Sequence, residues 1–251
     1  MSADDAVGQQ PAGEGGAARP ARPRGGGVLA AVRETVLVVA VALVVSLVVK
    51  TFLLQAFYIP SQSMERTLDI GDRVVVSKLT PGPFALHRGD VVVFADPGGW
   101  LTDTPEPERG PLGAVVADVL TFVGLLPEDS DEHLIKRVVG LPGDHVVCCD
   151  EQGRVTVNDV PVDETAYLFP GAEPSQVTFD VTVPEDRLWV MGDNRAESAD
   201  SRYNGDKQYG GFVPLEDVVG RAYAVVWPLS HLDWLGTPEA FAQVPGRTGV
   251  G

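Results

Sequence analysis

The apolar residues of the chain form one long run followed by many short ones. The long run, Val36–Val49, has fourteen residues, of which only Ser46 is polar. Fourteen apolar residues are short for a membrane span, but residues 35–57 reach about 34 Å as a helix at about 1.5 Å per residue. Lys50 then lies near one interface, where its stem can extend toward water. We therefore expect a transmembrane anchor region at residues 28–57.

A cleavable signal peptide is the alternative interpretation of the same run. Its N-terminal segment would be unusually long, and the best small-residue cleavage site, after Ala56, would have Leu54 two residues before it. A buried core helix is disfavoured because the run has no polar face. An uncleaved anchor is the interpretation that we favour.

From Tyr58 onward the pattern changes to short, valine-rich runs separated by Gly, Pro, Asp and Asn. Many short strands with turn signals predict a mostly β domain, and no long amphipathic helices alternate with them. Residues 150–153 read as a hairpin turn. The expected strands are Arg73–Ser77, Asp90–Phe94, Leu134–Val139, His145–Cys149, Val155–Val157, Val177–Val183, Leu188–Met191 and Val218–Trp227.

Three segments lack this pattern. Residues 1–27 are rich in Gly, Ala, Pro and Arg and are expected to be a disordered tail. Residues 97–133 interrupt the β-rich domain, which spans residues 58–235, as an insertion. Residues 236–251 are expected to be a flexible C-terminal tail.

The charge of the chain changes at the anchor. The whole chain carries a net charge of −16 with a mean hydropathy of +0.06. Residues 51–251 hold 14 Lys and Arg against 31 Asp and Glu, whereas four arginines precede the apolar run. The positive-inside rule then places the N-terminus in the cytoplasm and the β-rich domain on the extracytoplasmic face of the cytoplasmic (inner) membrane. So acidic a chain is not expected to bind nucleic acid.

Cysteines and histidines give no chemical site by their spacing. Cys148 and Cys149 are too few for a disulfide framework, and a bridge between neighbours needs strained geometry, so two free, buried thiols are expected. The histidines are scattered among turn residues and are expected at the surface. No spacing suggests a metal site. The histidines are His87, His133, His145 and His231.

Lys136 is unusual among the three lysines that follow the anchor region, because it lies inside a strand-like run. By alternation it shares a face with Leu134 and Val138, and desolvation there would lower its pKa. A neutral lysine can act as general base to a serine. From this context alone, a lysine that reaches solvent from an edge strand is an open alternative.

Two polar segments are candidates to work with Lys136. Ser61 and Ser63 follow Pro60 and, by alternation, present both hydroxyls on one side, although a plain turn has the same pattern. Residues 191–202 are a dense polar run after an apolar strand. They read either as a solvated loop or as a platform whose serine orients a neighbouring base.

Taken together, four segments resemble the type I signal peptidase family, a family of serine/lysine peptidases. They match the family in order and in approximate separation, and the resemblance extends from about Phe52 to Trp227. The fold that it implies is a mostly β, membrane-anchored antiparallel catalytic domain, of the type shared with SOS-repressor peptidases, preceded by one transmembrane helix. The segments are Ile59–Leu68, Gly71–Val76, Lys136–Asp144 and Gly192–Arg202.

The resemblance implies a role for each matching residue. Ser63 would be the nucleophile and Lys136 the unprotonated general base, which Ser198 orients by a hydrogen bond. The Ser63 backbone N–H and the Ser61 hydroxyl would form the oxyanion hole. The network that shapes the site would be Asp193, Arg195, Asp200 and Arg202.

The same resemblance implies the substrate and its pockets. The partners are secretory preproteins with signal peptides, which carry small residues at −1 and −3, and the phospholipid membrane. An extended substrate would bind by strand addition. No cofactor and no metal are implied. The residues that match pocket positions are Phe57, Ile59, Met64, Leu68, Leu134 and Ile135.

Arg66 departs from the family, which often has proline there, and it should alter local rigidity more than chemistry. Two other classes of protein remain as alternatives. A self-cleaving SOS-type repressor also uses a Ser–Lys pair but needs a DNA-binding domain in place of the anchor. A non-catalytic scaffold domain would be marked by loss of Ser63 or Lys136, and both residues are present.

Overall fold

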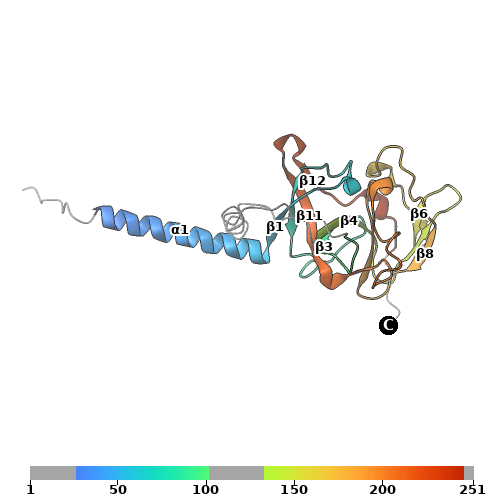
Figure 1. Cartoon of the computed structure of the whole chain (residues 1–251), viewed down its shortest axis with the longest axis horizontal. Coiled ribbons are helices and arrows are strands. Elements are labelled where there is room, and N and C mark those ends of the chain that lie inside the picture. Colours follow the sequence, from blue (N-terminus) through green and yellow to red (C-terminus); the bar gives the residue numbers. More distant parts are fainter. Residues whose placement is uncertain (1–26, 102–132, 246–251) are drawn as a thin grey trace, which may run out of the picture. The chain divides into compact units, whose positions relative to one another are not determined.

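The structure, a computed structural model, describes residues 27–101 and 133–245. Helix α1 (Gly27–Phe52) is drawn in blue in Figure 1. Its segment Leu29–Phe52 has a mean hydropathy of 2.5 and, by length and composition, can cross a membrane; it is the one such helix in the described ranges. The chain divides into two compact units, residues 1–42 and 43–251.

The helix ends earlier than the sequence predicted. We expected the anchor region to run to residue 57, but α1 ends at Phe52 and Leu54–Tyr58 form strand β1. This strand pairs antiparallel with β2 (Arg73–Ser77), and it buries Gln55 and Phe57, two residues apart. Pairing with β2 satisfies the backbone in an extended form, which outweighs the continuous hydropathy of the segment.

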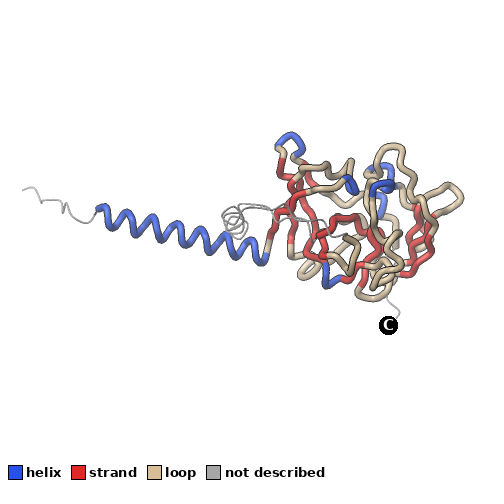
Figure 2. Tube along the Cα trace, in the orientation of Figure 1, coloured by secondary structure: helices blue, strands red, loops and turns tan. Residues whose placement is uncertain are grey.

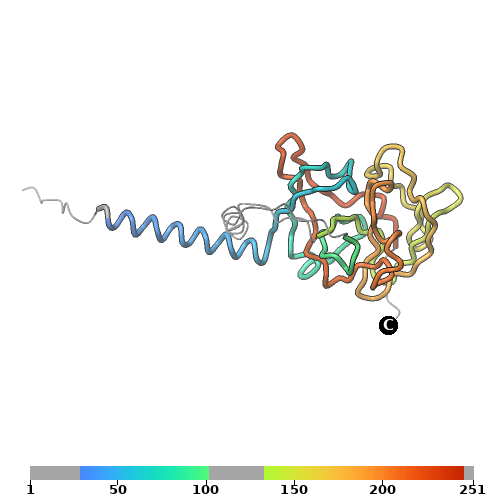
Figure 3. The backbone as a smooth tube through the Cα atoms, in the orientation of Figure 1, coloured from blue at the N-terminus to red at the C-terminus, as the bar shows by residue number. Residues whose placement is uncertain are grey.

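A large antiparallel sheet forms the body of the second unit. Its strands follow the order β1-β2-β11-β3-β4-β9-β10, and β12 pairs with β11. Figure 3 shows the cyan chain of β1 and β2 beside the orange-red chain of β11, far away in sequence. The remaining bounds are β3 Val91–Ala95, β4 His133–Gly140, β9 Arg187–Met191, β10 Val213–Pro214, β11 Val218–Trp227 and β12 Asp233–Trp234.

A smaller sheet follows the order β7-β6-β5-β8 and is also antiparallel. Figure 2 shows its strands in red to the right of the large sheet. The expected hairpin at residues 150–153 joins β5 to β6, where Asp150 N donates to Arg154 O over 3.0 Å. The bounds are β5 His145–Cys148, β6 Val155–Val157, β7 Val160–Pro161 and β8 Phe179–Thr182.

The central strands β3, β4 and β9 of the large sheet are buried on both faces, which explains their continuous apolar runs. In β3, Val91 and Val93 belong to one core cluster, while Val92 and Phe94 belong to another. Each expected strand run overlaps one strand, with bounds that differ by no more than two residues. The mostly β, antiparallel fold class with one N-terminal apolar helix is confirmed. The strands that the sequence did not predict are β1, β7, β10 and β12.

Two expectations for the second unit were wrong. Part of the expected flexible tail is ordered, because Phe241 and Val244 are buried in the core cluster that includes the small sheet. Cys148 and Cys149 are joined in a disulfide instead of being free thiols. Strand β5 ends at Cys148, so the alternation that would separate their side chains does not continue through Cys149.

Other expectations lie largely outside the described residues. These are the disordered tail at residues 1–27, of which α1 includes the last residue, and the insertion at residues 97–133. Within the described part of the insertion, the Trp100 ring packs edge-on against Phe94, with ring centroids 5.8 Å apart.

Candidate active site

The loop between β1 and β2 carries the candidate nucleophile. The two ends of this loop are joined by two backbone hydrogen bonds of 2.9 Å, from Ile59 N to Asp72 O and from Gly71 N to Ile59 O. The 3-10 helix η1 (Gln62–Met64) then carries Ser63, which is 4% exposed. Ser63 is therefore buried, and it lies on a loop whose two ends are held together by hydrogen bonds.

Lys136 lies in the middle of β4 and reaches this serine. Its Nζ is 2.8 Å from Ser63 Oγ and 2.9 Å from the carbonyl oxygen of Ile135. The ammonium form donates both hydrogen bonds. The neutral amine has a lone pair that can accept the serine proton over the same short distance. The structure thus brings together two residues that are 73 positions apart in the sequence.

Burial makes the neutral form of Lys136 accessible. The side chain is 4% exposed, and desolvation lowers its pKa from 10.5 to about 8. The nearby carboxylates of Asp200 and Asp193 oppose this shift by favouring the ammonium. Since desolvation is the larger effect, a substantial fraction of the lysine is neutral at mildly alkaline pH.

Ser61 places a second hydroxyl beside the nucleophile. Its Oγ is 3.3 Å from Ser63 Oγ, and its side chain makes no capping hydrogen bond to η1. It lies at the surface, in contrast to buried Ser63. This hydroxyl therefore has the freedom to turn toward a group bound at Ser63.

Ser198 points elsewhere than expected. We expected its hydroxyl to bond to the lysine amine, but in the described residues it donates to Asp200 Oδ2 over 2.7 Å. A carboxylate is the stronger acceptor for this proton, because charge-assisted hydrogen bonds are stronger than neutral ones. Its predicted role in orienting Lys136 stays a prediction.

Gly192 lets the serine loop and the polar platform approach each other. A Cβ atom there would lie 2.2 Å from Ser198 Oγ and 2.5 Å from the carbonyl oxygen of Ser63. The same Ser63 oxygen accepts a hydrogen bond from Asn194 N over 3.1 Å. Only glycine fits this position without moving the backbone of the candidate nucleophile.

Replacing Gly192 with alanine is therefore expected to destabilise the protein by about 1–3 kcal/mol and to lower its peptidase activity. Thermal unfolding and turnover measure the two effects. Gly205→Ala is the matched control, because no atom lies within 4 Å of the Cβ it would add. Equal melting temperatures and activities in the two variants would contradict this account of the contact.

Buried ion pairs hold the platform behind the site. Asp193 accepts from Arg137 Nε (2.8 Å) and Nη2 (2.6 Å), and from Thr67 Oγ1 (2.5 Å). Asp200 accepts from Arg202 Nε and Nη2, each at 2.8 Å, and its Oδ2 also accepts from Gly192 N over 2.9 Å. Asp193 and Asp200, two residues of the expected network, are thus paired with buried arginines, and Asp200 also bonds to the glycine beside Ser63.

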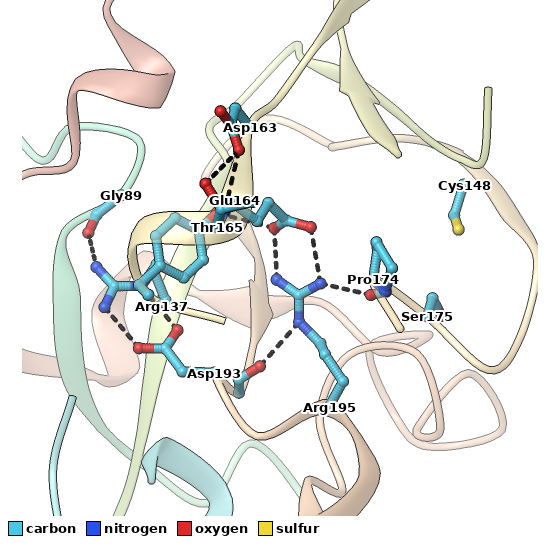
Figure 4. A network of polar contacts seen from close by, with 12 residues as sticks. Gly89, Arg137, Cys148, Asp163, Glu164, Thr165, Pro174, Ser175, Asp193 and Arg195 are labelled. Carbon is cyan, nitrogen blue, oxygen red and sulfur yellow. Dashed lines mark hydrogen bonds and ion pairs between the residues drawn. The ribbon is translucent and has the colours of Figure 1, made fainter. Parts of the chain in front are cut away.

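Sequence reasoning did not assign Arg137 to this network. Its guanidinium joins Asp193 to the carbonyl oxygen of Gly89, 2.7 Å from Nη1, as Figure 4 shows. Its position directly after Lys136 in a matching segment was the available signal.

A pocket of about 110 Å³ lies beside Lys136. It is bounded by the chain around Phe57–Ser61 and by the first half of β4, residues 133–136. Of the predicted pocket residues, Phe57, Ile59, Leu134 and Ile135 line it. Met64 and Leu68 do not line it, although they belong to the same buried core cluster as Phe57, Ile59 and Ile135.

His133, which we expected at the surface, also lines this pocket, and its ring centroid is 5.3 Å from that of Phe57. Within the described ranges, no group of three or more His, Cys, Asp or Glu is arranged to hold a metal ion.

Comparison of the sequence with known proteins shows the family to which the chain belongs. The family model described as signal peptidase, peptidase S26, matches residues 32–227. A probable signal peptidase I of Mycobacterium leprae is 36% identical in an alignment 232 residues long, which covers 81% of this chain and 79% of that protein. Signal peptidase I of Mycobacterium tuberculosis H37Rv is 37% identical in an alignment 219 residues long, which covers 79% of this chain and 74% of that protein. Signal peptidase I of Leptolyngbya laminosa is 31% identical, in an alignment that covers 83% of this chain and 86% of that protein.

The chain belongs to the signal peptidase family, peptidase S26. It is accordingly a peptidase, a hydrolase that acts on peptide bonds. The resemblance that the four sequence segments indicated is confirmed.

Proposed function

We propose that this protein is a membrane-bound serine endopeptidase that removes N-terminal signal peptides from exported preproteins after small residues. Ser63 is its nucleophile and Lys136 its general base. The observation that carries the proposal is the 2.8 Å contact between Ser63 Oγ and the buried amine of Lys136, whose pKa is lowered to about 8.

The first half of the reaction follows from this contact. Neutral Lys136 takes the proton of Ser63 Oγ while the oxygen attacks the scissile carbonyl carbon. The C–N bond then breaks, the lysine ammonium gives the proton to the leaving amine, and an ester joins the signal peptide to Ser63. The Ser63 backbone N–H and the Ser61 hydroxyl stabilise the negative oxygen of the intermediate.

The second half uses the same base. Lys136 removes a proton from water, and the resulting hydroxide attacks the ester carbonyl. The ester bond breaks, Ser63 Oγ recovers the proton from Lys136, and the signal peptide leaves as a carboxylic acid, which loses its proton to water. Ser63 and Lys136 thus supply the proton transfers of bond making and breaking, and no cofactor enters the proposal.

An unpaired strand edge provides the place for the substrate. Strand β4 pairs with β9 only from Arg137 to Gly140, so among the described strands residues 134–136 have no strand partner on that side. An extended peptide can add there as a strand and place alternate side chains toward the protein. The small pocket beside Lys136 favours small side chains next to the cleaved bond.

The apolar helix and the charge distribution support a location at the membrane. The helix can span a bilayer by length, and the four arginines that precede the apolar run favour a cytoplasmic N-terminus. The catalytic domain then faces the extracytoplasmic side of the cytoplasmic membrane, where exported preproteins emerge.

The lysine mechanism predicts a specific pH dependence. Lys136 has a pKa of about 8, so kcat/KM should rise through about pH 8 and fall about tenfold for each pH unit below it. The sign follows from the role of the base, since only the neutral amine can accept the serine proton. A pH profile of precursor cleavage measures this, and a maximum near pH 5 would contradict it.

A cleavage assay tests the function itself. The full chain, in detergent or reconstituted in vesicles, is incubated with a precursor whose signal peptide ends in Ala-x-Ala, and the products are identified by mass spectrometry. We expect one cut after the second alanine and no cut when the −1 alanine is replaced by leucine. An intact Ala-x-Ala precursor would end the proposal.

A further inference from the structure

A short turn that connects two strands of the small sheet contacts the network behind the active site. Helix η3 (Glu164–Ala166) lies between β7 and β8, outside the four segments that match the family. The Glu164 carboxylate meets the Arg195 guanidinium in two bonds, Oε2–Nη1 at 2.9 Å and Oε1–Nη2 at 2.5 Å. Their side chains are only 3% and 1% exposed. Figure 4 shows the Arg195 guanidinium facing this carboxylate.

The next residues of the same turn extend the contact to the second arginine. The Tyr167 hydroxyl donates to Glu164 Oε1 over 2.8 Å, and its ring lies 4.3 Å from the Arg137 guanidinium carbon. The backbone N–H of Phe169 donates to the carbonyl oxygen of Asp193 over 3.0 Å. The turn therefore fixes the polar platform at several points.

A chain of contacts leads from Glu164 to the candidate nucleophile. Arg195 Nε donates to the carbonyl oxygen of Gly192 over 2.9 Å. Gly192 in turn packs against Ser198 and against the Ser63 carbonyl, closely enough that a Cβ would collide with both. A shift of Arg195 would thus move the backbone on which Ser63 rests.

The charges of the buried network are balanced when Glu164 is included. Each of three arginines is paired with one carboxylate, and all six side chains are almost completely buried. Glu164 supplies one of the three negative charges. The pairs are Arg137–Asp193, Arg195–Glu164 and Arg202–Asp200.

We propose that Glu164 is a positioning residue of the peptidase reaction, which holds Gly192, and through it Ser63, in the reactive arrangement by way of its paired bonds to Arg195. This inference rests on the proposed function. Glu164 touches neither the substrate nor the reacting atoms. It acts from the turn between β7 and β8, through an arginine that lies inside a family motif.

Replacing Glu164 with glutamine tests the proposal, because the amide keeps the shape but loses the charge and one acceptor. A displacement of about 1 Å at a reacting group can cost about 10²-fold in rate, so we expect kcat to fall by about that factor with little change in KM. Asp144→Asn is the matched control. It breaks another two-bond ion pair, with Arg88, in which both distances are 2.6 Å.

Both variants are expected to lower the melting temperature, but only Glu164→Gln should lower kcat. If both retain the wild-type kcat, or lose it equally in proportion to stability, the positioning role is refuted.

The pH profile gives a readout that a purely structural role would not change. Without Glu164 the network around Lys136 carries one more positive charge, so the acid limb of kcat/KM should move to lower pH in Glu164→Gln. The charged groups that remain there are the three arginines with Asp193 and Asp200, and Tyr167 lies beside them. The limb of Asp144→Asn should stay in place. An unmoved limb in Glu164→Gln would count against the proposal.

Two further outcomes are separable. If the wild-type chain does not cleave the precursor, the proposed function fails, and Glu164 is not at issue. If Glu164→Gln does not fold, Glu164→Asp tests the positioning role instead. Aspartate keeps the charge but is too short to meet both guanidinium nitrogens. A reduced kcat in folded Glu164→Asp would support the proposal, and wild-type kcat would overturn it.

Discussion

Ser63→Ala is expected to abolish cleavage of a signal-peptide precursor, with a loss in kcat on the order of 10⁴-fold or more. Alanine removes the oxygen that attacks the carbonyl, and Lys136 then has nothing to activate at 2.8 Å. Because Ser63 is buried and its hydroxyl is small, the fold should persist. Single-turnover cleavage of the precursor, followed by gel or mass spectrometry, measures the loss.

The exposed Ser230 provides the control for this substitution. Ser230→Ala removes the same oxygen in the same domain and should cleave like the wild type. Binding of the precursor should survive in Ser63→Ala, since the pocket and the strand edge are unchanged. Appreciable cleavage by folded Ser63→Ala would show that another residue is the nucleophile.

Lys136→Met is expected to lose activity to a similar extent and, at neutral pH, to gain stability. Methionine fills a similar length without a charge and cannot accept the proton of Ser63. In the wild type, the pKa of Lys136 falls from 10.5 to about 8 on folding. At about 1.36 kcal/mol per unit, the folded state loses roughly 3 kcal/mol below pH 8, and Lys136→Met removes that penalty.

The sign of the stability effect can be checked against pH. The lowered pKa means that the unfolded state binds more protons between about pH 8 and 10.5, so wild-type stability should rise with pH across that window. The gain from Lys136→Met should therefore shrink there. Denaturant unfolding at several pH values measures it, with exposed Lys207→Met as the control. A variant that is inactive but less stable at every pH would argue against a desolvated lysine.

These two substitutions act on one catalytic unit. The double variant Ser63→Ala/Lys136→Met should thus be no less active than either single variant. Additive losses would mean that the two side chains work in separate steps.

The sequence predicted the central strands well because β3, β4 and β9 are buried on both faces of the large sheet. Val91–Phe94 form a continuous apolar run, which is distinctive in itself. The boundary between α1 and β1, in contrast, is not marked by the apolar pattern of the sequence. Hydropathy continues through residues 52–58, and only the pairing of β1 with β2 decides where the helix ends. Phe241 and Val244 are isolated apolar residues, and only the tertiary fold buries them.

Some residues of the candidate site were likewise predictable from the sequence, and others were not. Ser63 and Lys136 lie in segments with recognisable neighbours, so the resemblance singled them out, and the structure brings them into contact. Glu164 carries no local signal, because its contact with Arg195 joins two segments 31 residues apart. The direction of the Ser198 hydroxyl depends on competition between the Lys136 amine and the Asp200 carboxylate as acceptors. The spacing of residues along the chain does not predict which acceptor is used.

The half-paired edge of β4 has a consequence for which preproteins can be processed. A helical peptide uses its backbone N–H and C=O groups within its own turns and has none to offer to residues 134–136. If substrates bind at this edge, the segment that enters the site has to be unwound over several residues before the bond is cut. The strand edge would then select substrates by backbone conformation before side chains are compared, and a stable helix across the cleavage point would protect a preprotein even when its residues at −1 and −3 are small.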